Sequence, residues 1–156
     1  MKLITKKPIR LLKIGDKKYK VLENIEYING LIVPEGFITD LASTPSILED
    51  IFPHDDMEYS SSAILHDFLY SKQQMYGINR ETSDKIFRQL MIYSGVNPVK
   101  ADLIYKAVRT FGSSHYEIPK INNIIPYNKV ALIDHTPEHK KYQNQMKELL
   151  GKWYVG

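Results

Sequence analysis

The sequence predicts an α+β fold in which a small N-terminal antiparallel sheet is followed by a bundle of about four to five helices. Up to residue 40, apolar residues come in short β-favouring runs separated by turn residues. From Thr44 onward, apolar residues recur at the three- and four-residue spacing that is typical of amphipathic helices. The change of period near residue 40 therefore divides the chain into a strand-rich part and a helical part.

Length and composition are those of an ordinary globular protein. The chain has 156 residues, of which 43% are hydrophobic and 25% are charged. We expect a single domain over residues 1–156. Within it we expect strands mainly in 1–40, a helical core in 44–112, an irregular stretch in 113–135 and a peripheral helix in 136–150.

Composition also excludes several classes of site. The chain contains no cysteine, which excludes disulfide frameworks, thiolate nucleophiles and zinc–thiolate sites. Its net charge of +3 comes from lysines that are spread out, apart from the stretches 17–20 and 140–141. This gives no strong nucleic-acid signal; we interpret the charge mainly as an aid to solubility, with a phosphate-bearing partner as a minor alternative. We expect no membrane span, because no apolar run approaches about 20 residues. We also expect a cytoplasmic protein, because no apolar signal-peptide core follows Met1.

Short apolar runs and turn signals predict about four strands in the first forty residues. Asn29-Gly30 is the strongest two-residue hairpin signal, and Gly15-Asp16 and Glu35-Gly36 favour further turns. The predicted β segments are Ile9–Ile14, Tyr19–Leu22, Ile25–Ile28, Leu31–Val33 and Phe37–Ile38.

Capping residues and helix breakers delimit the predicted helices. Thr44-Pro45 and Asn97-Pro98 suit helix starts, and Gly95 and Gly112 suit helix ends. The predicted helices run from Thr44 to about Phe52, and over 58–71, 80–93, 98–111 and 136–150. The last of these is polar, so we expect it to be peripheral or to contact a partner.

Three clusters of polar residues could carry chemistry. The segment 36–45, GFITDLASTP, lies between the predicted sheet and the first helix. The segment 63–70, AILHDFLY, lies within the second predicted helix. Arg80 and Asp84, followed by Ile86-Phe87, open the third.

These clusters, in their order, resemble the signature of the domain of unknown function 1353 (DUF1353) family. The blocks are VPEGFITDLASTP, AILHDFLY, R-x-x-x-D-x-I-F and AVRTFG, and the resemblance covers roughly residues 31–112. The family is found mainly in phages and prophages, and its biochemical function is not established. The resemblance implies a phage origin, and with it the cytoplasm of an infected bacterial host or the virion. It points to the candidate site residues Asp40, Ser43, His66, Asp67, Arg80, Asp84 and Arg109.

His66 and Asp67 are the candidate metal ligands. Neighbours on a helix point about 100° apart, so both reach one ion only where the helix faces a cleft. Histidine with carboxylates suits zinc, manganese or iron. The pair is also similar to the metal-site pair of the HD phosphohydrolase superfamily, but the rest of that pattern is missing and we infer no membership. The alternative is that His66 is a buried helix histidine held by a carboxylate without any chemistry.

The remaining candidates also have structural alternatives. For a catalytic role we consider Asp40, His66 and Asp84, and for substrate binding we consider Ser43, Arg80 and Arg109. Asp40 can equally cap the following turn, and a Ser at the position of Ser43 is more often a helix N-cap. The two arginines can pair with buried carboxylates, in which case the network is wholly structural.

Three functions therefore compete. The first is a small hydrolase that uses one divalent metal, held at the His/Asp site, to lower the pKa of a bound water. The second is a non-catalytic phage module that binds virion or tail proteins or a host protein. The third, a weaker alternative, sequesters a small phosphorylated signal through Arg80 and Arg109. An open pocket containing His66 and Asp67 favours the first function, whereas full burial and pairing of these side chains favours the second.

Overall fold

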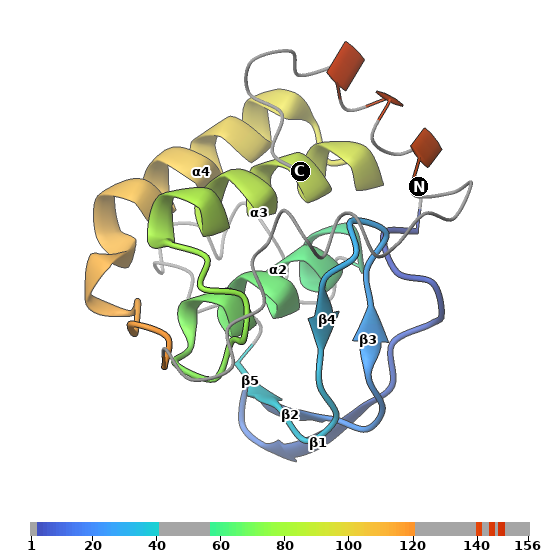
Figure 1. Ribbon diagram of the computed structural model, residues 1–156, viewed down its shortest axis with the longest axis vertical. Coiled ribbons are helices and arrows are strands. Elements are labelled where there is room, and N and C mark those ends of the chain that lie inside the picture. Colours follow the sequence, from blue (N-terminus) through green and yellow to red (C-terminus); the bar gives the residue numbers. More distant parts are fainter. Residues whose placement is uncertain (1–2, 41–56, 121–139, 142–143, 146, 149–156) are drawn as a thin grey trace.

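The computed structural model describes residues 3–40 and 57–120, together with residues 140, 141, 144, 145, 147 and 148. The strand-rich and helical parts follow one another as the sequence predicts (Figure 1). The α+β class is therefore confirmed. None of the described helices is long and apolar enough to cross a membrane.

The described strands form two small antiparallel sheets. In the first sheet, β1 (Leu11–Gly15) pairs with β2 (Lys18–Val21), and β2 pairs with β5 (Ile38–Thr39). The second is the hairpin of β3 (Ile25–Glu26) and β4 (Ile32–Val33). Asn29 and Gly30 lie in the turn of this hairpin, where Gly30 takes a φ of 86° and the Asn29 side chain accepts a hydrogen bond from Leu31 N–H.

The sequence-based expectation of one four-stranded sheet is corrected by the segment after β4. Pro34 ends β4, and Gly36 then takes a φ of 91°, a backbone angle that residues with a side chain rarely adopt. The Gly36 N–H donates to Val21 O, at the end of β2. The chain therefore turns away from β4, and β5 is added to β2 in the first sheet.

Three α-helices stack beside the strands. They are α2 (Met57–Tyr70), α3 (Arg80–Ser94) and α4 (Pro98–Phe111), and a 3-10 turn, η1 (Gly112–Ser114), follows α4. The Asn79 side chain caps α3 by accepting from Thr82 N–H, and Gly95 ends it with a φ of 116°. Asn97 caps α4 in the same way by accepting from Val99 N–H.

The expected number of four to five helices is corrected to three α-helices in the part of the chain that the structure describes. The helix expected from Thr44 falls in residues 41–56, outside the described residues. Of the helix expected over 136–150, only six residues are described, and these have helical conformation. The three helices in residues 57–111 lie within one residue of their predicted ends.

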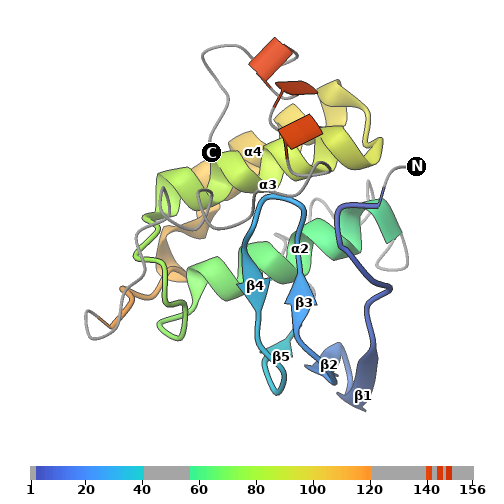
Figure 2. The same ribbon diagram turned by 45° about the vertical axis from the view of Figure 1, so that its right-hand side comes forward.

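Helix α2 is the central element, because the strands pack on one side of it and α3 packs on the other (Figures 1 and 2). Phe68 and Leu69 of α2 join Val33, Phe37 and other residues of the strands in one buried apolar cluster. A second cluster lies among the helices and comprises Tyr59, Ala63, Phe87, Met91, Val96, Ala101, Ile104 and Val108. Of the polar candidates, His66, Arg80, Asp84 and Arg109 lie where α2, α3 and α4 come together.

Candidate functional site

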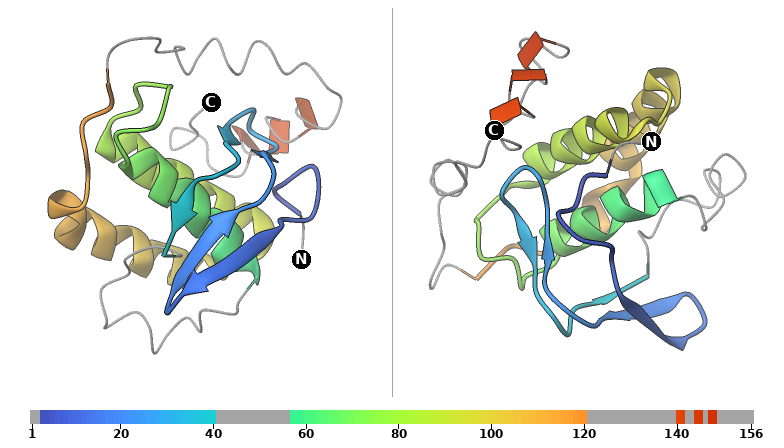
Figure 3. Two further views of the ribbon diagram at one scale, coloured as in Figure 1. Left: turned by 90° about the horizontal axis from the view of Figure 1, so that it is seen from below. Right: turned by 90° about the vertical axis from the view of Figure 1, so that its right-hand side faces the viewer.

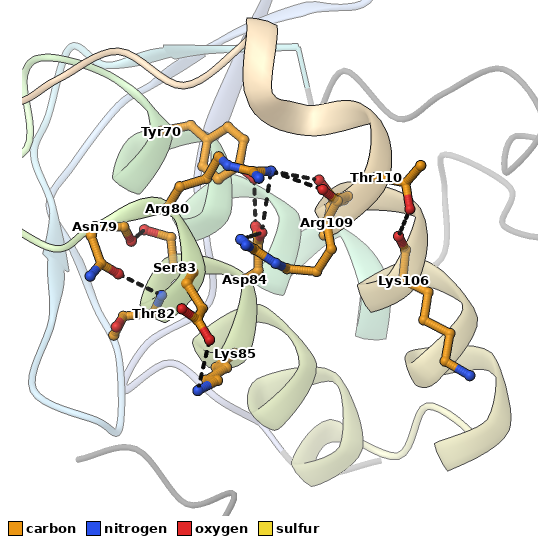
Figure 4. Close-up of polar contacts among 12 residues, drawn as sticks. Tyr70, Asn79, Arg80, Thr82, Ser83, Asp84, Lys85, Lys106, Arg109 and Thr110 are labelled. Atoms are coloured by element: carbon orange, nitrogen blue, oxygen red, sulfur yellow. Dashed lines mark hydrogen bonds and ion pairs between the residues drawn. The ribbon is translucent and has the colours of Figure 1, made fainter.

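Asp84 is the centre of the polar network. Its side chain is 0% exposed. Its Oδ1 lies 2.7 Å from Nε2 of His66 and accepts a 2.6 Å hydrogen bond from the Tyr70 hydroxyl. Its Oδ2 accepts from Nη1 of Arg109 at 2.8 Å, and Nη1 of Arg80 is 3.9 Å away (Figure 4). Four side chains from three helices thus converge on one carboxylate.

Helical spacing explains why these residues meet. His66 and Tyr70 are four residues apart on α2, so both lie on the same face of that helix. Arg80 and Asp84 are likewise four residues apart on α3. Because α3 packs between α2 and α4, its Asp84 receives donors from α2 on one side and Arg109 of α4 on the other.

The surrounding donors keep the buried carboxylate ionised. Burial by itself would raise the pKa of Asp84, but the hydrogen bonds, that from His66 first, outweigh it and leave the pKa below its usual value. On the opposite side, burial lowers the pKa of Arg109, but Asp84, with smaller contributions from Tyr105 and Glu81, raises it above its usual value, so its guanidinium stays charged. The site therefore contains a buried ion pair rather than a neutral carboxyl.

Arg80 also forms hydrogen bonds with the end of α4. Its Nη1 donates to the carbonyl oxygens of Val108 and Arg109 at 3.1 and 3.2 Å. The Val108 carbonyl also accepts from the Gly112 N–H, whereas the carbonyls that follow it in the last turn have no partner within the helix. Arg80 therefore joins the start of α3 to the end of α4 and brings its charge close to Asp84 in the same position (Figure 4).

The imidazole of His66 is fixed by stacking as well as by Asp84. It is 5% exposed, and its ring lies on that of Phe87, with centroids 4.4 Å apart and planes at 23°. The ring of Tyr70 flanks it at 4.2 Å. No described residue forms a hydrogen bond with Nδ1 of His66.

Tyr70 and Gly112 also belong to the site, although neither was among the candidate site residues and the sequence indicated Gly112 only as a helix end. Burial and the adjacent Asp84 raise the pKa of Tyr70, so its phenol stays protonated and donates. A Cβ on Gly112 would lie 2.8 Å from the Tyr70 hydroxyl oxygen. Only glycine leaves room for Tyr70 at the end of α4.

Asp67 is directed to a different partner from His66. Its Oδ2 accepts a 2.6 Å hydrogen bond from Oγ1 of Thr39, at the end of β5. This contact ties the first sheet to α2. The adjacent Asp40 is exposed, and Ser43 lies outside the described residues.

A cavity of about 350 Å³ lies beside this network. Its polar lining includes Lys18, Asp40, His66, Asp67, His115 and Glu117, and its apolar lining includes Phe37, Ile38, Val108 and Phe111. Tyr70 and Gly112 also line it, whereas Arg80 and Arg109 are not among the described residues that do. The structure thus brings Asp40, His66 and Asp67 to one cavity and places the two arginines behind it, around Asp84.

Comparison with known families shows what the chain is related to. A family model described as a protein of unknown function, DUF1353, matches residues 17–108, which is more than half of the chain. The chain belongs to the DUF1353 family. No curated protein and no solved structure matches it significantly. The match begins earlier than the resemblance predicted from residue 31, and it ends before Arg109 and Gly112.

The described residues of this DUF1353 member do not fit a metal centre. Among them, no group of three or more His, Cys, Asp or Glu side chains is placed to hold an ion. Nε2 of His66 faces Asp84, whose other oxygen is bound by the cation of Arg109. The expectation that His66 and Asp67 together bind a divalent metal stays a prediction.

Proposed function

We propose that the protein is a hydrolase in which His66 is the general base and Asp84 is the residue that positions it. The contact of 2.7 Å between Nε2 of His66 and Oδ1 of the buried Asp84 carries this proposal. An ionised carboxylate accepts hydrogen bonds, so the proton of a neutral imidazole is on Nε2. Nδ1 is then left with the lone pair that a base needs.

The surroundings of His66 support a role in proton transfer. The residue lines the cavity, and Phe87 and Tyr70 hold the plane of its ring. A base of this kind takes a proton from water as the water oxygen attacks the electrophilic atom of the substrate. The imidazolium that forms is stabilised by Asp84 and returns its proton to the leaving group.

The charges of the cavity favour a neutral or cationic substrate. Among the described residues of its lining, the carboxylates of Asp40, Asp67 and Glu117 outnumber the lysines, of which Lys18 is one. A phosphoester dianion would be repelled by such a wall. An ester or amide with apolar substituents would instead find contacts at Phe37 and the other apolar residues of the lining. We therefore favour carboxylic ester or amide hydrolysis over phosphoester hydrolysis.

The burial of His66 and its pairing with Asp84 also fit the non-catalytic alternative, whereas sequestration receives less support from these contacts. Sequestration of a phosphorylated signal needs Arg80 and Arg109 for the ligand, but Asp84 and the α4 carbonyls engage them. A non-catalytic module that binds phage or host proteins needs only a stabilising role for Asp84. Two measurements distinguish this module from the hydrolase: which nitrogen of the His66 ring carries the proton, and whether the protein hydrolyses esters or amides.

Nitrogen NMR of the His66 side chain tests the geometry directly. We expect the neutral ring to carry its proton on Nε2, and we expect Asp84→Asn to change this signal. Esters and amides would then be screened with the native protein and with His66→Gln. We expect the substitution to lower turnover at least about 100-fold, the smallest usual contribution of a general base. Protonation on Nδ1 in the native protein would refute the assignment of the base.

Asp67→Asn is the matched control, because Asp67 lines the same cavity next to His66 on α2. It removes one negative charge from the cavity wall without touching Asp84, so its main effect should be on KM. Measurement of bound metal in the native protein, His66→Ala and Asp67→Ala tests the alternative in which the hydrolase depends on a metal held by these two residues. Near-stoichiometric metal that is lost in both variants would replace the proposal with that alternative.

A further inference from the structure

The positive charge of the chain is concentrated in its first 22 residues. This stretch contains eight of the 21 basic residues and one of the 18 acidic residues, a formal charge of +7. Since the whole chain carries +3, the remaining residues carry −4. Because few lysines are adjacent in the sequence, this difference in charge between the first 22 residues and the rest becomes clear only when the charges are counted.

The strand register places some of these cations on one face of the first sheet, among exposed aliphatic residues. Leu12 of β1 lies opposite Lys20 of β2, and Lys20 lies opposite Ile38 of β5. Side chains two residues apart on a strand share a face, which adds Lys18. Leu12 and Ile38 are 51% and 53% exposed, and Ile14 next to them is 46% exposed. We call Leu12, Ile14, Lys18, Lys20 and Ile38 the cationic sheet face.

The β1–β2 hairpin that carries most of this face projects from the molecule on the side away from α3 and α4 (Figure 3). The opposite face of the sheet contributes Val21 to the buried core, and Leu11 and Tyr19 pack against it. The aliphatic residues of the cationic sheet face therefore do not contribute to that core. Exposed aliphatic side chains surrounded by lysines are a feature of surfaces that bind partners.

We propose that the cationic sheet face binds the surface of an anionic lipid bilayer. Lysines near such a surface are attracted by the negative headgroups, and aliphatic side chains gain free energy by entering the boundary between headgroups and acyl chains. Both kinds of residue are present on one face. The proposal does not depend on the hydrolase proposal, although Lys18 and Ile38 also line the cavity and thus place its mouth beside the bound membrane.

A peptide strand or a nucleic acid would contact fewer residues of the cationic sheet face than a lipid bilayer. A peptide strand added to β1 would meet Lys13 in mid-strand and the irregularity between Lys13 and Gly15, and both oppose edge pairing. Nucleic acid would engage the lysines, but single strands are bound by aromatic stacking. The large exposed apolar residues of this face are aliphatic and would have no role in that binding.

Vesicle co-sedimentation tests the proposal with phosphatidylcholine vesicles that contain or lack phosphatidylserine. We expect the native protein to bind only the vesicles with phosphatidylserine, and binding to weaken as salt is added. Lys18→Glu/Lys20→Glu should lower binding at least about 25-fold, since each lysine near the surface contributes about fivefold. Leu12→Ser should lower it about tenfold through the loss of buried aliphatic area.

The chain offers a matched control for each variant. Lys100→Glu/Lys106→Glu changes the net charge by the same amount on exposed positions of α4. Leu103→Ser removes a leucine that is 48% exposed on α4. Equal losses in the controls, or no binding to anionic vesicles at low salt, would overturn the proposal. So would unchanged vesicle binding by Leu12→Ser combined with equally tight binding to duplex DNA, which would indicate a general polyanion site.

Discussion

Gly112→Ala is the sharpest test of the packing around Asp84. The backbone of Gly112 has a φ of −82° and a ψ of −9°, which alanine adopts readily. Without any clash, alanine here would stabilise the protein by about 0.4–1 kcal/mol through the unfolded state. The new Cβ, however, would lie 2.8 Å from the Tyr70 hydroxyl oxygen, so one of the two groups must move.

The expected loss of stability depends on whether the backbone at position 112 or the side chain of Tyr70 moves. Overpacking of this kind destabilises by about 1–3 kcal/mol. If Tyr70 retreats instead, its 2.6 Å hydrogen bond to the buried Asp84 is lost, and a bond to a charged group contributes about 1.5–3 kcal/mol. After subtraction of the gain from alanine, we expect Gly112→Ala to lower the free energy of unfolding by about 2 kcal/mol.

A double-mutant cycle with Tyr70→Phe isolates the cause. Phenylalanine lacks the hydroxyl, and the remaining ring atoms near the new Cβ are 3.3 and 3.5 Å away. In that background the destabilisation by Gly112→Ala should fall below about 1 kcal/mol, which leaves a coupling of at least about 1 kcal/mol. Chemical denaturation measures all four proteins, and Gly15→Ala, whose Cβ would be 3.7 Å from Lys18 Cβ, is the control. Equal effects of Gly112→Ala in both backgrounds would refute the reasoning.

Three further predictions concern stability. Asp84→Asn should destabilise by about 3–5 kcal/mol, because it leaves the buried donors of α2 and the partly buried guanidinium of Arg109 without their carboxylate, whereas Asp102→Asn on the half-exposed pair with Arg88 should change stability by less than about 1 kcal/mol. Because the pKa of Asp84 is lower in the folded than in the unfolded protein, its ionisation contributes stability that is complete above the unfolded pKa. That contribution is lost as the pH falls through the folded pKa; denaturation from neutral to acid pH should show the native protein losing stability relative to Asp84→Asn, and a constant difference would contradict this. Asn79→Ala should lower stability by about 1 kcal/mol, since α3 loses its N-cap, and a change in thermal unfolding near zero would contradict the cap.

Local signals predicted most of the described secondary structure. The turn at Asn29-Gly30 and the helix end at Gly95 depend only on neighbouring residues, so the sequence is sufficient to place them. The division into two sheets was not predictable in the same way. It depends on the hydrogen bond between Gly36 and Val21, which are far apart in the sequence.

The site was predictable in its charged members but not in its geometry. His66, Arg80, Asp84 and Arg109 lie in the sequence blocks of the family resemblance, and charged or titratable groups that become buried need partners. The sequence could not tell that all of them share the carboxylate of Asp84. Tyr70 could be expected to line a groove but was not among the candidate site residues, because a tyrosine more often lies at the edge of a core; its spacing of four residues from His66 is the signal that could have placed it in the site.

The contacts of Asp84 give a physical meaning to the sequence blocks that are far apart along the chain. One block supplies His66 and Tyr70, the next supplies Arg80 and Asp84 itself, and the last supplies Arg109. A sequence under selection only for a stable core would not need a buried carboxylate, since apolar replacements of buried ion pairs are often at least as stable. A protein that needs a histidine with a fixed ring and a fixed proton does need one. The contacts of Asp84 that join the helices therefore also hold His66 at the cavity, so an assay of the proposed hydrolysis in variants of these residues is informative only on protein that is still folded.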